Sequence, residues 1–400
     1  MESIILPDAA WRNRPGLARL TEILGDGQAR YVGGAVRDTL LNLPVADVDI
    51  ATPLRPETAM ERLKDAGIKV VPTGLRHGTI TAVLEGGPVE VTTLRHDIST
   101  DGRHAVVAYT DDWEADAARR DFTMNALYAD PASGRIFDYF GGLSDLAERR
   151  VRFIGDPMQR IAEDHLRILR FFRFLARFGD APDPQGLEAC AARANDLMAL
   201  SRERIADELL KLLVAKAAPR IVALMVEHGI FRPVLPEIGI AGAKHLSRLA
   251  GAEQQAGISP DPIRRLAALL PPEKGVAEAV GARLKLSRAQ QRRLVSATGT
   301  VDAPPEALAY RLGIDTAIDR LLLHQGDDDA IRSVRHLKNW QVPRFPLTGG
   351  AIVARGVAKG PEVARLLQRA EAQWIAEGFP DASRVETIAD HIVNQESRKN

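Results

Sequence analysis

The chain has 400 residues, 45% of them hydrophobic and 26% charged, so it is long enough for several domains with buried cores. Its 53 lysines and arginines balance 53 aspartates and glutamates, which excludes a globally basic nucleic-acid coat and leaves room only for a local one. The single cysteine excludes an internal disulfide, and no apolar run reaches the roughly 18 residues of a membrane helix. Since Met1–Pro7 also lacks the basic start of a signal peptide, we expect a cytoplasmic protein with no membrane segment.

The first part of the chain carries strand patterns. Residues of alternating polarity or β-branched type occur in short runs that end at glycines, as is typical of strands. A Gly86-Gly87 pair between two of these runs predicts a hairpin turn. The predicted strands are Ala29–Val32, Ala46–Ile50, Gly78–Leu84 and Val89–Leu94.

The character of the chain changes further on. The polar stretch Asp97–Asp112, with Gly102 inside it, is predicted to be a mobile loop. After Asp156-Pro157, apolar residues recur at helical spacing from Ile161 to Leu175, and no clear strand follows. The sequence therefore predicts an α+β fold, in which a head of mixed sheet and helices precedes a long all-α remainder.

Asp47 and Asp49 are the first candidate site. Two residues apart on a predicted strand, their carboxylates share one face. Adjacent acids repel each other unless a cation lies between them, and hard oxygen ligands favour Mg²⁺. Two acids on a solvated turn are the alternative for so short a pattern.

The segment upstream favours the metal site. Gly33-Gly34 is predicted to open a helix whose backbone N–H groups can hold a triphosphate, with Arg37 one turn further on to bind the same anion. Glu90, on another predicted strand, is either a third acid of the metal site or a charge on an edge strand.

Taken in order, these motifs resemble the class II tRNA nucleotidyltransferase and bacterial poly(A) polymerase family, within the DNA polymerase beta-like superfamily. The resemblance covers about residues 31 to 208, roughly half of the chain. The second half matches no motif. The motifs that carry the resemblance are Gly33–Asp38, Asp47–Thr52, Glu90–Arg95, Asp101–His104, Arg119–Leu127, Asp138–Gly142, Glu163–Arg170 and Ser201–Ile205.

The resemblance implies four parts: a catalytic head (1–145), a helical neck that recognises the base (146–215), a helical body (216–330) and an RNA-binding tail (331–400). It implies that CTP and ATP are added to a tRNA 3′ end without a nucleic-acid template. The RNA 3′ hydroxyl would attack the nucleotide α-phosphate with two Mg²⁺ on Asp47 and Asp49, and pyrophosphate would leave.

Arg119-Arg120-Asp121 is predicted to open a helix. In the family this segment recognises the ribose, and the chemistry agrees because Asp121 can accept from a sugar hydroxyl while a neighbouring arginine holds phosphate. Asn125, one turn on, is expected on the same side as Asp121. The alternative is a charged helix start capped by Asp121.

Asp164 and Arg167 lie three residues apart on the predicted neck helix and should share a face. A carboxylate beside a guanidinium accepts the edges of C and A and rejects those of U and G. The resemblance implies that this pair serves as a protein template, and it extends nucleotide contact to Arg170. A surface ion pair is the alternative.

The neck is also locally basic, which is the pattern that phosphate contacts need, although some of its arginines are alternatively partners of protein acids. These arginines are Arg149, Arg150, Arg152, Arg160, Arg167, Arg170, Arg173 and Arg177.

Several functions share the head motifs. A poly(A) polymerase would use the same residues, but Leu41–Pro44, Val45, Ala46 and Val48 lack the basic and aromatic residues typical of those members, which favours the tRNA enzyme. An enzyme that adds only C or only A also stays open. A catalytically inactive RNA-binding protein is the alternative of another class, and both aspartates of the metal pair argue against it. The sequence does not indicate the oligomeric state.

Overall fold

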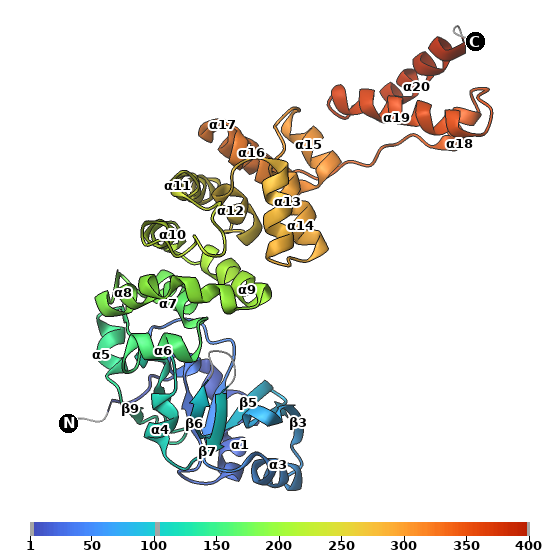
Figure 1. Cartoon of the computed structure of the whole chain (residues 1–400). Coiled ribbons are helices and arrows are strands. Elements are labelled where there is room, and N and C mark those ends of the chain that lie inside the picture. Colours follow the sequence, from blue (N-terminus) through green and yellow to red (C-terminus); the bar gives the residue numbers. More distant parts are fainter. Residues whose placement is uncertain (1–3, 101–104, 398–400) are drawn as a thin grey trace. The chain divides into compact units, whose positions relative to one another are not determined.

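A seven-stranded mixed sheet underlies the N-terminal part of the protein (Figure 1). The computed structural model describes residues 4–100 and 105–397, and the chain divides into two compact units, Met1–Ile240 and Ala241–Asn400. The strand order is β3-β4-β5-β2-β1-β8-β9, with β2 and β5 parallel and the other neighbours antiparallel. The strands are β1 (Arg30–Val32), β2 (Asp49–Thr52), β3 (Lys69–Gly74), β4 (Thr79–Leu84), β5 (Gly87–Thr93), β8 (Leu127–Ala129) and β9 (Ile136–Asp138).

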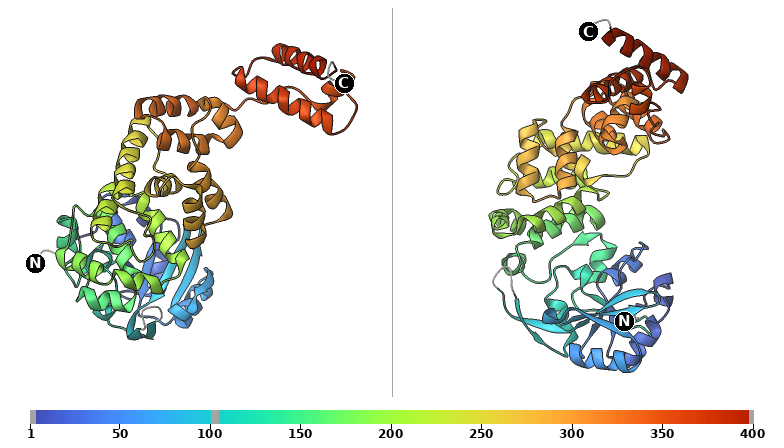
Figure 2. Two further views of the ribbon diagram at one scale, coloured as in Figure 1. Left: turned by 45° about the horizontal axis from the view of Figure 1, so that its top comes forward. Right: turned by 90° about the vertical axis from the view of Figure 1, so that its right-hand side faces the viewer.

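Short helices surround this sheet, and α6 to α9 gather at one end of it (Figure 2). Buried Val32, Ala51, Leu94 and Tyr128 form a core on the sheet, against which Trp113 packs. The helices of the first unit are η1 (Ala10–Asn13), α1 (Leu17–Leu24), α2 (Gly34–Leu40), α3 (Pro56–Asp65), η2 (Leu75–His77), α4 (Trp113–Ala118), η3 (Thr123–Asn125), α5 (Gly142–Ala147), α6 (Pro157–Glu163), α7 (Arg167–Phe178), α8 (Pro184–Ala192), η4 (Ala194–Ala199), α9 (Arg202–Leu213) and α10 (Ala218–Glu227).

The predicted α+β class is confirmed, and so are three of the four predicted strands of the head and the hairpin between β4 and β5; the strand predicted over Ala46–Ile50 begins later, as β2 over Asp49–Thr52. The loop predicted over Asp97–Asp112 is wrong in part, because β6 (Arg95–Thr100) and β7 (Ala105–Tyr109) form an antiparallel hairpin there. β-branched residues within this polar stretch favour extended backbone, and composition alone concealed them. The motif Asp101–His104 lies outside the described residues.

Two predicted helices begin at different places. Arg119-Arg120-Asp121 does not open a helix; α4 starts earlier, where the Asp112 carboxylate accepts hydrogen bonds from the backbone N–H groups of Glu114 and Ala115, and Arg119 ends it. The neck helix is also not continuous. Asp164 has extended backbone (φ −151°, ψ 106°) between α6 and α7, and its carboxylate accepts from the N–H of Leu166. An acid that bonds its own following backbone ends one helix and starts the next.

One short strand was also missed after residue 156. β11 (Ala181–Pro182) pairs in parallel with β10 (Arg150–Val151) at the base of the neck. Two residues are too few for a period-two pattern to appear in the sequence.

In its described residues the second unit consists of helices and the segments that connect them, with no strand. Its core includes a network of buried charges in which Glu253 accepts from Arg264 and Arg265, and Asp319 accepts from Arg264 and Arg293. The helices are α11 (Ile240–Ala256), α12 (Pro262–Leu269), α13 (Lys274–Arg283), α14 (Arg288–Ala297), α15 (Pro305–Leu312), α16 (Ile314–His324), α17 (Asp327–Leu337), α18 (Gly349–Val353), α19 (Pro361–Ala376) and α20 (Ala382–Ser397).

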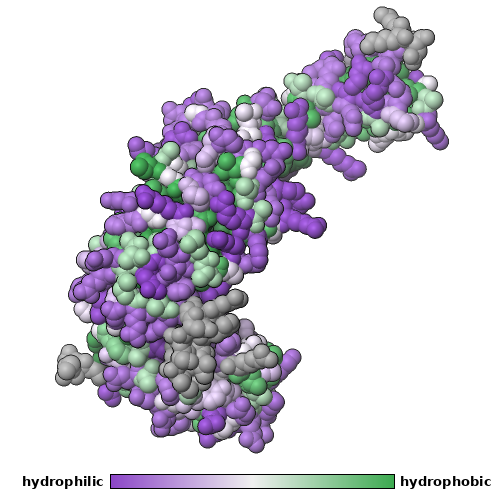
Figure 3. Space-filling model, viewed as in Figure 1, coloured by the Kyte–Doolittle hydropathy of each residue, from purple (hydrophilic) through white to green (hydrophobic). Residues whose placement is uncertain are grey.

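Hydrophilic residues dominate the face shown in Figure 3, with small apolar groups scattered among them. Within residues 4–100 and 105–397, no helix combines the length and apolar character needed to span a membrane.

Candidate functional site

One cavity of about 370 Å³ gathers the residues that the sequence singled out. All ten predicted nucleotide-binding residues and Asp49 line it, although they come from the head sheet, from α2, from the segment after α4 and from α7. Asp47 and Glu90 lie outside the lining. Phe174 of α7 was missed, since its place in an apolar helical pattern reads as core. The lining residues are Gly33, Gly34, Arg37, Asp49, Arg119, Arg120, Asp121, Asn125, Asp164, Arg167, Arg170 and Phe174.

Asp49 lines this cavity, and Asp47 and Glu90 lie near enough to it to influence its charge. Asp49 is the first residue of β2, and parallel pairing sets it opposite Glu90 of β5. Asp47 is exposed and precedes the strand, which corrects the prediction that both aspartates lie on it. The segment from Asn42 to Asp47, which contains Pro44, belongs to no strand, so β2 begins only at Asp49.

The electrostatics of these acids are unfavourable without a cation. Burial and the neighbouring Glu90 carboxylate raise the pKa of Asp49 to about 6, with Asp47 adding to the rise and Arg120 opposing it. In the described parts of the chain, none of the three carboxylates forms a salt bridge. Like charges kept close without an opposite charge are a feature of cation sites rather than of structural ion pairs.

These carboxylates could supply only some of the ligands that a metal ion needs. Among the described residues, no three His, Cys, Asp or Glu side chains converge as a ready metal site. Mg²⁺ commonly takes only one or two carboxylates and completes its shell with water and substrate phosphate. Asp47 and Asp49 therefore fit a metal that binds together with a nucleotide.

The glycine turn lies beside these acids. Gly33 has φ 68°, a backbone conformation that L side chains rarely adopt, and it directly precedes α2. A Cβ at Gly33 would lie 3.5 Å from Nη1 of Arg120, so glycine also keeps this approach open. The predicted opening of a helix at Gly33-Gly34 is confirmed.

Arg37 is less available than predicted. Its guanidinium donates from Nη1 to Oδ1 of Asn125 (2.5 Å) and from Nε to Oδ1 of Asp38 (2.7 Å), and it lies 4.3 Å from the centroid of the Phe178 ring. The side chain is buried. Arg37 thus supports the floor of the cavity as well as lining it.

Asp116, which the sequence analysis missed, fixes the two arginines. Its buried carboxylate accepts from Nε of Arg119 (2.9 Å), from Nη2 of Arg120 (3.0 Å) and from the hydroxyl of Tyr128 (2.6 Å). It also accepts from the backbone N–H of Arg95, where the β6-β7 hairpin begins. Its spacing of three and four residues before the arginines on a helix was the signal available in the sequence.

Asp121 is the most fully paired acid of the cavity. Burial alone would raise its pKa, but the charge of Arg170 and hydrogen bonds from Asn125 and the Phe122 N–H lower it below the usual value. Arg170 donates from Nε to Oδ2 of Asp121 (2.7 Å), and Asn125 donates from Nδ2 to Oδ1 (2.9 Å). The predicted nearness of Asn125 and Asp121 is confirmed.

Asp164 and Arg167 line the same cavity, but they share no helix face and, in the described residues, form no ion pair with each other. Arg204 donates from Nη2 to both oxygens of Asp164 (3.2 and 3.1 Å). Arg167 donates to Glu163 and to the backbone carbonyls of Arg160 and Arg119. The two side chains are therefore held independently, each by its own partners.

The basic neck is neutralised by protein acids. Each of its eight arginines forms at least one salt bridge, within the head and neck. Arg173, for example, donates from Nε to Oε2 of buried Glu208 (2.5 Å), and Arg170 lies 3.8 Å from the same carboxylate. The alternative that these arginines pair with acids of the protein thus holds for all eight.

Comparison with known proteins adds independent findings. The family model of the poly A polymerase head domain matches residues 29–152, and that of the probable RNA and SrmB-binding site of polymerase A matches residues 181–240. The chain is 36% identical over 386 residues to the human mitochondrial CCA tRNA nucleotidyltransferase 1, covering 91% of this chain and 87% of that protein. It is 39% identical over 219 residues to the CCA-adding enzyme of Bacillus licheniformis, covering 54% and 53% of the two chains.

Solved structures agree in fold. The CCA-adding enzyme of Bacillus stearothermophilus in complex with CTP superposes with a TM-score of 0.76 at 26% identity, covering 98% of this chain and 99% of that one. The Thermotoga maritima CCA-adding enzyme complexed with tRNA gives a TM-score of 0.70 at 20% identity, covering 98% and 99%.

Proposed function

The chain belongs to the CCA tRNA nucleotidyltransferase family, and we propose that it adds C, C and A to tRNA 3′ ends from CTP and ATP. The observation that carries the proposal is the cavity that Asp49, the Gly33-Gly34 turn and the separately held Asp164 and Arg167 line together. Pyrophosphate is the second product. We assign tRNA as the partner, and we propose that the C-terminal tail (331–400) contributes to binding it.

Enzymes of this family use a divalent metal, and we propose Mg²⁺ for this chain. Asp47 and Asp49 would hold it, with Glu90 beside them, and the ion would acidify the attacking hydroxyl and neutralise charge on the leaving phosphates. The raised pKa of Asp49 supports this assignment, because a carboxylate kept near its neighbours gains most from a cation.

The nucleotide's phosphates fit the end of β1. Gly33 and Gly34 line the cavity there; the Gly33 N–H already donates to the carbonyl of Leu127, so the N–H of Gly34 at the start of α2 is the backbone donor that we propose for phosphate. Arg119 and Arg120 line the same space with guanidinium groups that Asp116 has already oriented. A donor whose position is fixed before binding loses little entropy when the phosphate arrives.

The ribose fits beside Asp121 and Asn125. Asp121 stays ionised because its pKa is lowered, so it remains an acceptor for a sugar hydroxyl. Arg170, Asn125 and the Phe122 N–H hold it in place and occupy both carboxylate oxygens, so a sugar hydroxyl would share an oxygen with one of these donors. This arrangement supports selection of ribonucleotides.

The base fits between Asp164 and Arg167. The carboxylate accepts from the exocyclic amine of C or A, and the guanidinium donates to the neighbouring ring nitrogen. Asp164 and Arg167 do not pair with each other, so no ion pair between them has to break when the base binds, although each keeps a partner of its own in Arg204 and Glu163.

The compartment that we propose is the cytoplasm, since a single cysteine cannot form an internal disulfide. The human relative carries the word mitochondrial in its name, so import of a tagged chain into organelles is the measurement that distinguishes the two.

Incorporation on a tRNA transcript that ends before CCA tests the function. With Mg²⁺ and each NTP alone and then combined, read at single-nucleotide resolution, we expect addition to stop after C, C and A. A long ladder with ATP alone would instead indicate a poly(A) polymerase, and addition of only C or only A a partial enzyme. No incorporation under any condition would overturn catalysis and leave an RNA-binding protein.

A further inference from the structure

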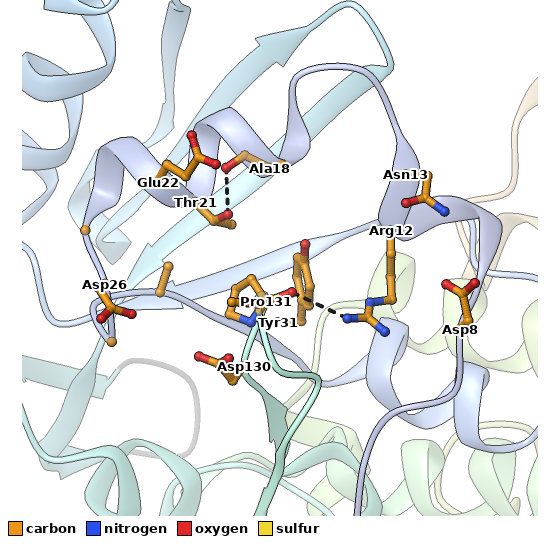
Figure 4. Close-up of a pocket in the computed structure, with 14 residues that line it drawn as sticks. Asp8, Arg12, Asn13, Ala18, Thr21, Glu22, Asp26, Tyr31, Asp130 and Pro131 are labelled. Carbon is orange, nitrogen blue, oxygen red and sulfur yellow. Dashed lines mark hydrogen bonds between the residues drawn. The ribbon is translucent and has the colours of Figure 1, made fainter.

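A second cavity, of about 500 Å³, lies in the head and shares no lining residue with the nucleotide cavity. It is bounded by η1, by α1 and the loop after it, by β1 and by the turn after β8 (Figure 4). Its volume lies within the range of small-molecule sites.

The charges around this cavity are mostly negative. Four acids, Asp8, Glu22, Asp26 and Asp130, line it with one cation, Arg12. In the described parts of the chain, Asp8, Glu22 and Asp26 form no salt bridge, and Asp130 accepts from the N–H and hydroxyl of Ser133. Figure 4 shows Glu22 and Asp26 on one side of the cavity and Arg12 and Asp8 on the other.

The tyrosine between these charges has a hydroxyl that is open to the cavity and has no protein partner in the described residues. Tyr31 of β1 is 2% exposed and lines the cavity, where it stands between the two groups of charges. In the described residues its hydroxyl has no hydrogen-bond partner, although its ring packs edge-on against Trp11 (4.8 Å between centroids). Because the rest of the side chain is buried while the hydroxyl keeps contact with the cavity, a molecule bound there can serve as its hydrogen-bond partner.

We propose that this cavity binds a small organic polycation, a linear polyamine with two or more ammonium groups. Ammonium groups would donate to the separated carboxylates and to the Tyr31 oxygen, and the apolar methylenes between them would lie along Ala29, Pro131 and the tyrosine ring. A compact metal ion does not fit as well, since the described acids offer no group of three close ligands.

Binding to the full chain tests this proposal by calorimetry at physiological salt, with spermidine as the probe. We expect one saturable site. The double variant Glu22→Gln, Asp26→Asn should weaken binding about tenfold, since each exposed charge pair contributes modestly. Tyr31→Phe should weaken it about threefold while the ring stays packed.

Matched variants separate this site from general attraction to acids. Glu57→Gln, Glu61→Gln removes two exposed acids of α3 outside the cavity and should leave the affinity unchanged. Asp47→Ala should also leave spermidine binding unchanged, which distinguishes this site from the nucleotide cavity and from a failure of the proposed function. The proposal is overturned by no saturation up to about 1 mM spermidine, by equal weakening in the α3 variant, by full displacement with equimolar Mg²⁺, or by tighter binding of inorganic phosphate.

Discussion

The two sides of the nucleotide cavity differ in whether their acids are paired with cations. At the sheet edge, Asp47, Asp49 and Glu90 lie together without a salt bridge in the described structure. On the neck side, Asp121 and Glu208 are each paired with arginines. Paired charges position a surface and cost little to keep, whereas unpaired like charges are tolerated where a cation arrives with the substrate. The difference therefore separates the groups that we assign to metal from those that shape the cavity.

The largest expected effect comes from Asp47→Ala. Removing one of two metal carboxylates should lower CCA incorporation at least about a thousandfold, because the charge of the leaving phosphates is then poorly neutralised. Single-turnover incorporation on a tRNA lacking CCA measures it. The exposed position of Asp47 predicts an unchanged melting temperature. Incorporation at the original rate would refute the metal assignment.

Glu208→Gln tests the neck side. Glu208 is 5% exposed and takes hydrogen bonds or charge from Arg173 and Arg170, so its loss leaves two cations uncompensated. We expect the free energy of unfolding to fall by about 2 kcal/mol, less than for a fully buried pair since the arginines are partly exposed. Urea denaturation measures it, and Asp207→Asn on the exposed side of α9 serves as control.

Arg167→Ala tests base reading. Without the guanidinium, discrimination of CTP over UTP should fall by about tenfold or more, as expected for loss of a group that pairs with one base edge. The ratio of kcat/KM for the two nucleotides measures it. Arg193→Ala removes another helix-end arginine of the neck, outside the cavity, and should leave that ratio unchanged. Equal ratios in the wild type and Arg167→Ala would exclude this residue from the template.

The smallest expected effect is that of Asp49→Asn, which should stabilise the fold instead of weakening it. Folding raises the pKa of Asp49 to about 6, so its ionised form destabilises the metal-free fold at neutral pH. Asp49→Asn should therefore increase the free energy of unfolding by about 1 kcal/mol, allowing for partial exposure. The gain should shrink as the pH falls through about 6 and vanish below the ordinary value of 3.8, where aspartate is neutral in both states. Thermal unfolding with EDTA measures it, with exposed Asp111→Asn as control; a loss of stability at neutral pH would contradict the electrostatic argument.

Much of the site was predictable because its chemistry depends on residue type and short spacing. Gly33 requires glycine for its positive φ, and the alternating pattern of Ala46–Ile50 indicated a strand at Asp49, although β2 starts only there. Asp116 and Phe174 were not found, since a helix-borne acid and an apolar helix residue read as ordinary surface and core until the cavity assembles around them.

The sequence by itself determined the fold class, three strands of the head and, through its motifs, the residues that line the nucleotide cavity except Phe174. Only the tertiary structure decided how they meet. The pairing of Asp49 with Glu90, the helix break at Asp164 and the separate partners of Asp164 and Arg167 all depend on contacts between distant segments. The physical reason is that propensity and periodicity act over a few residues, whereas charge pairing and strand register are fixed by the packing of the whole unit.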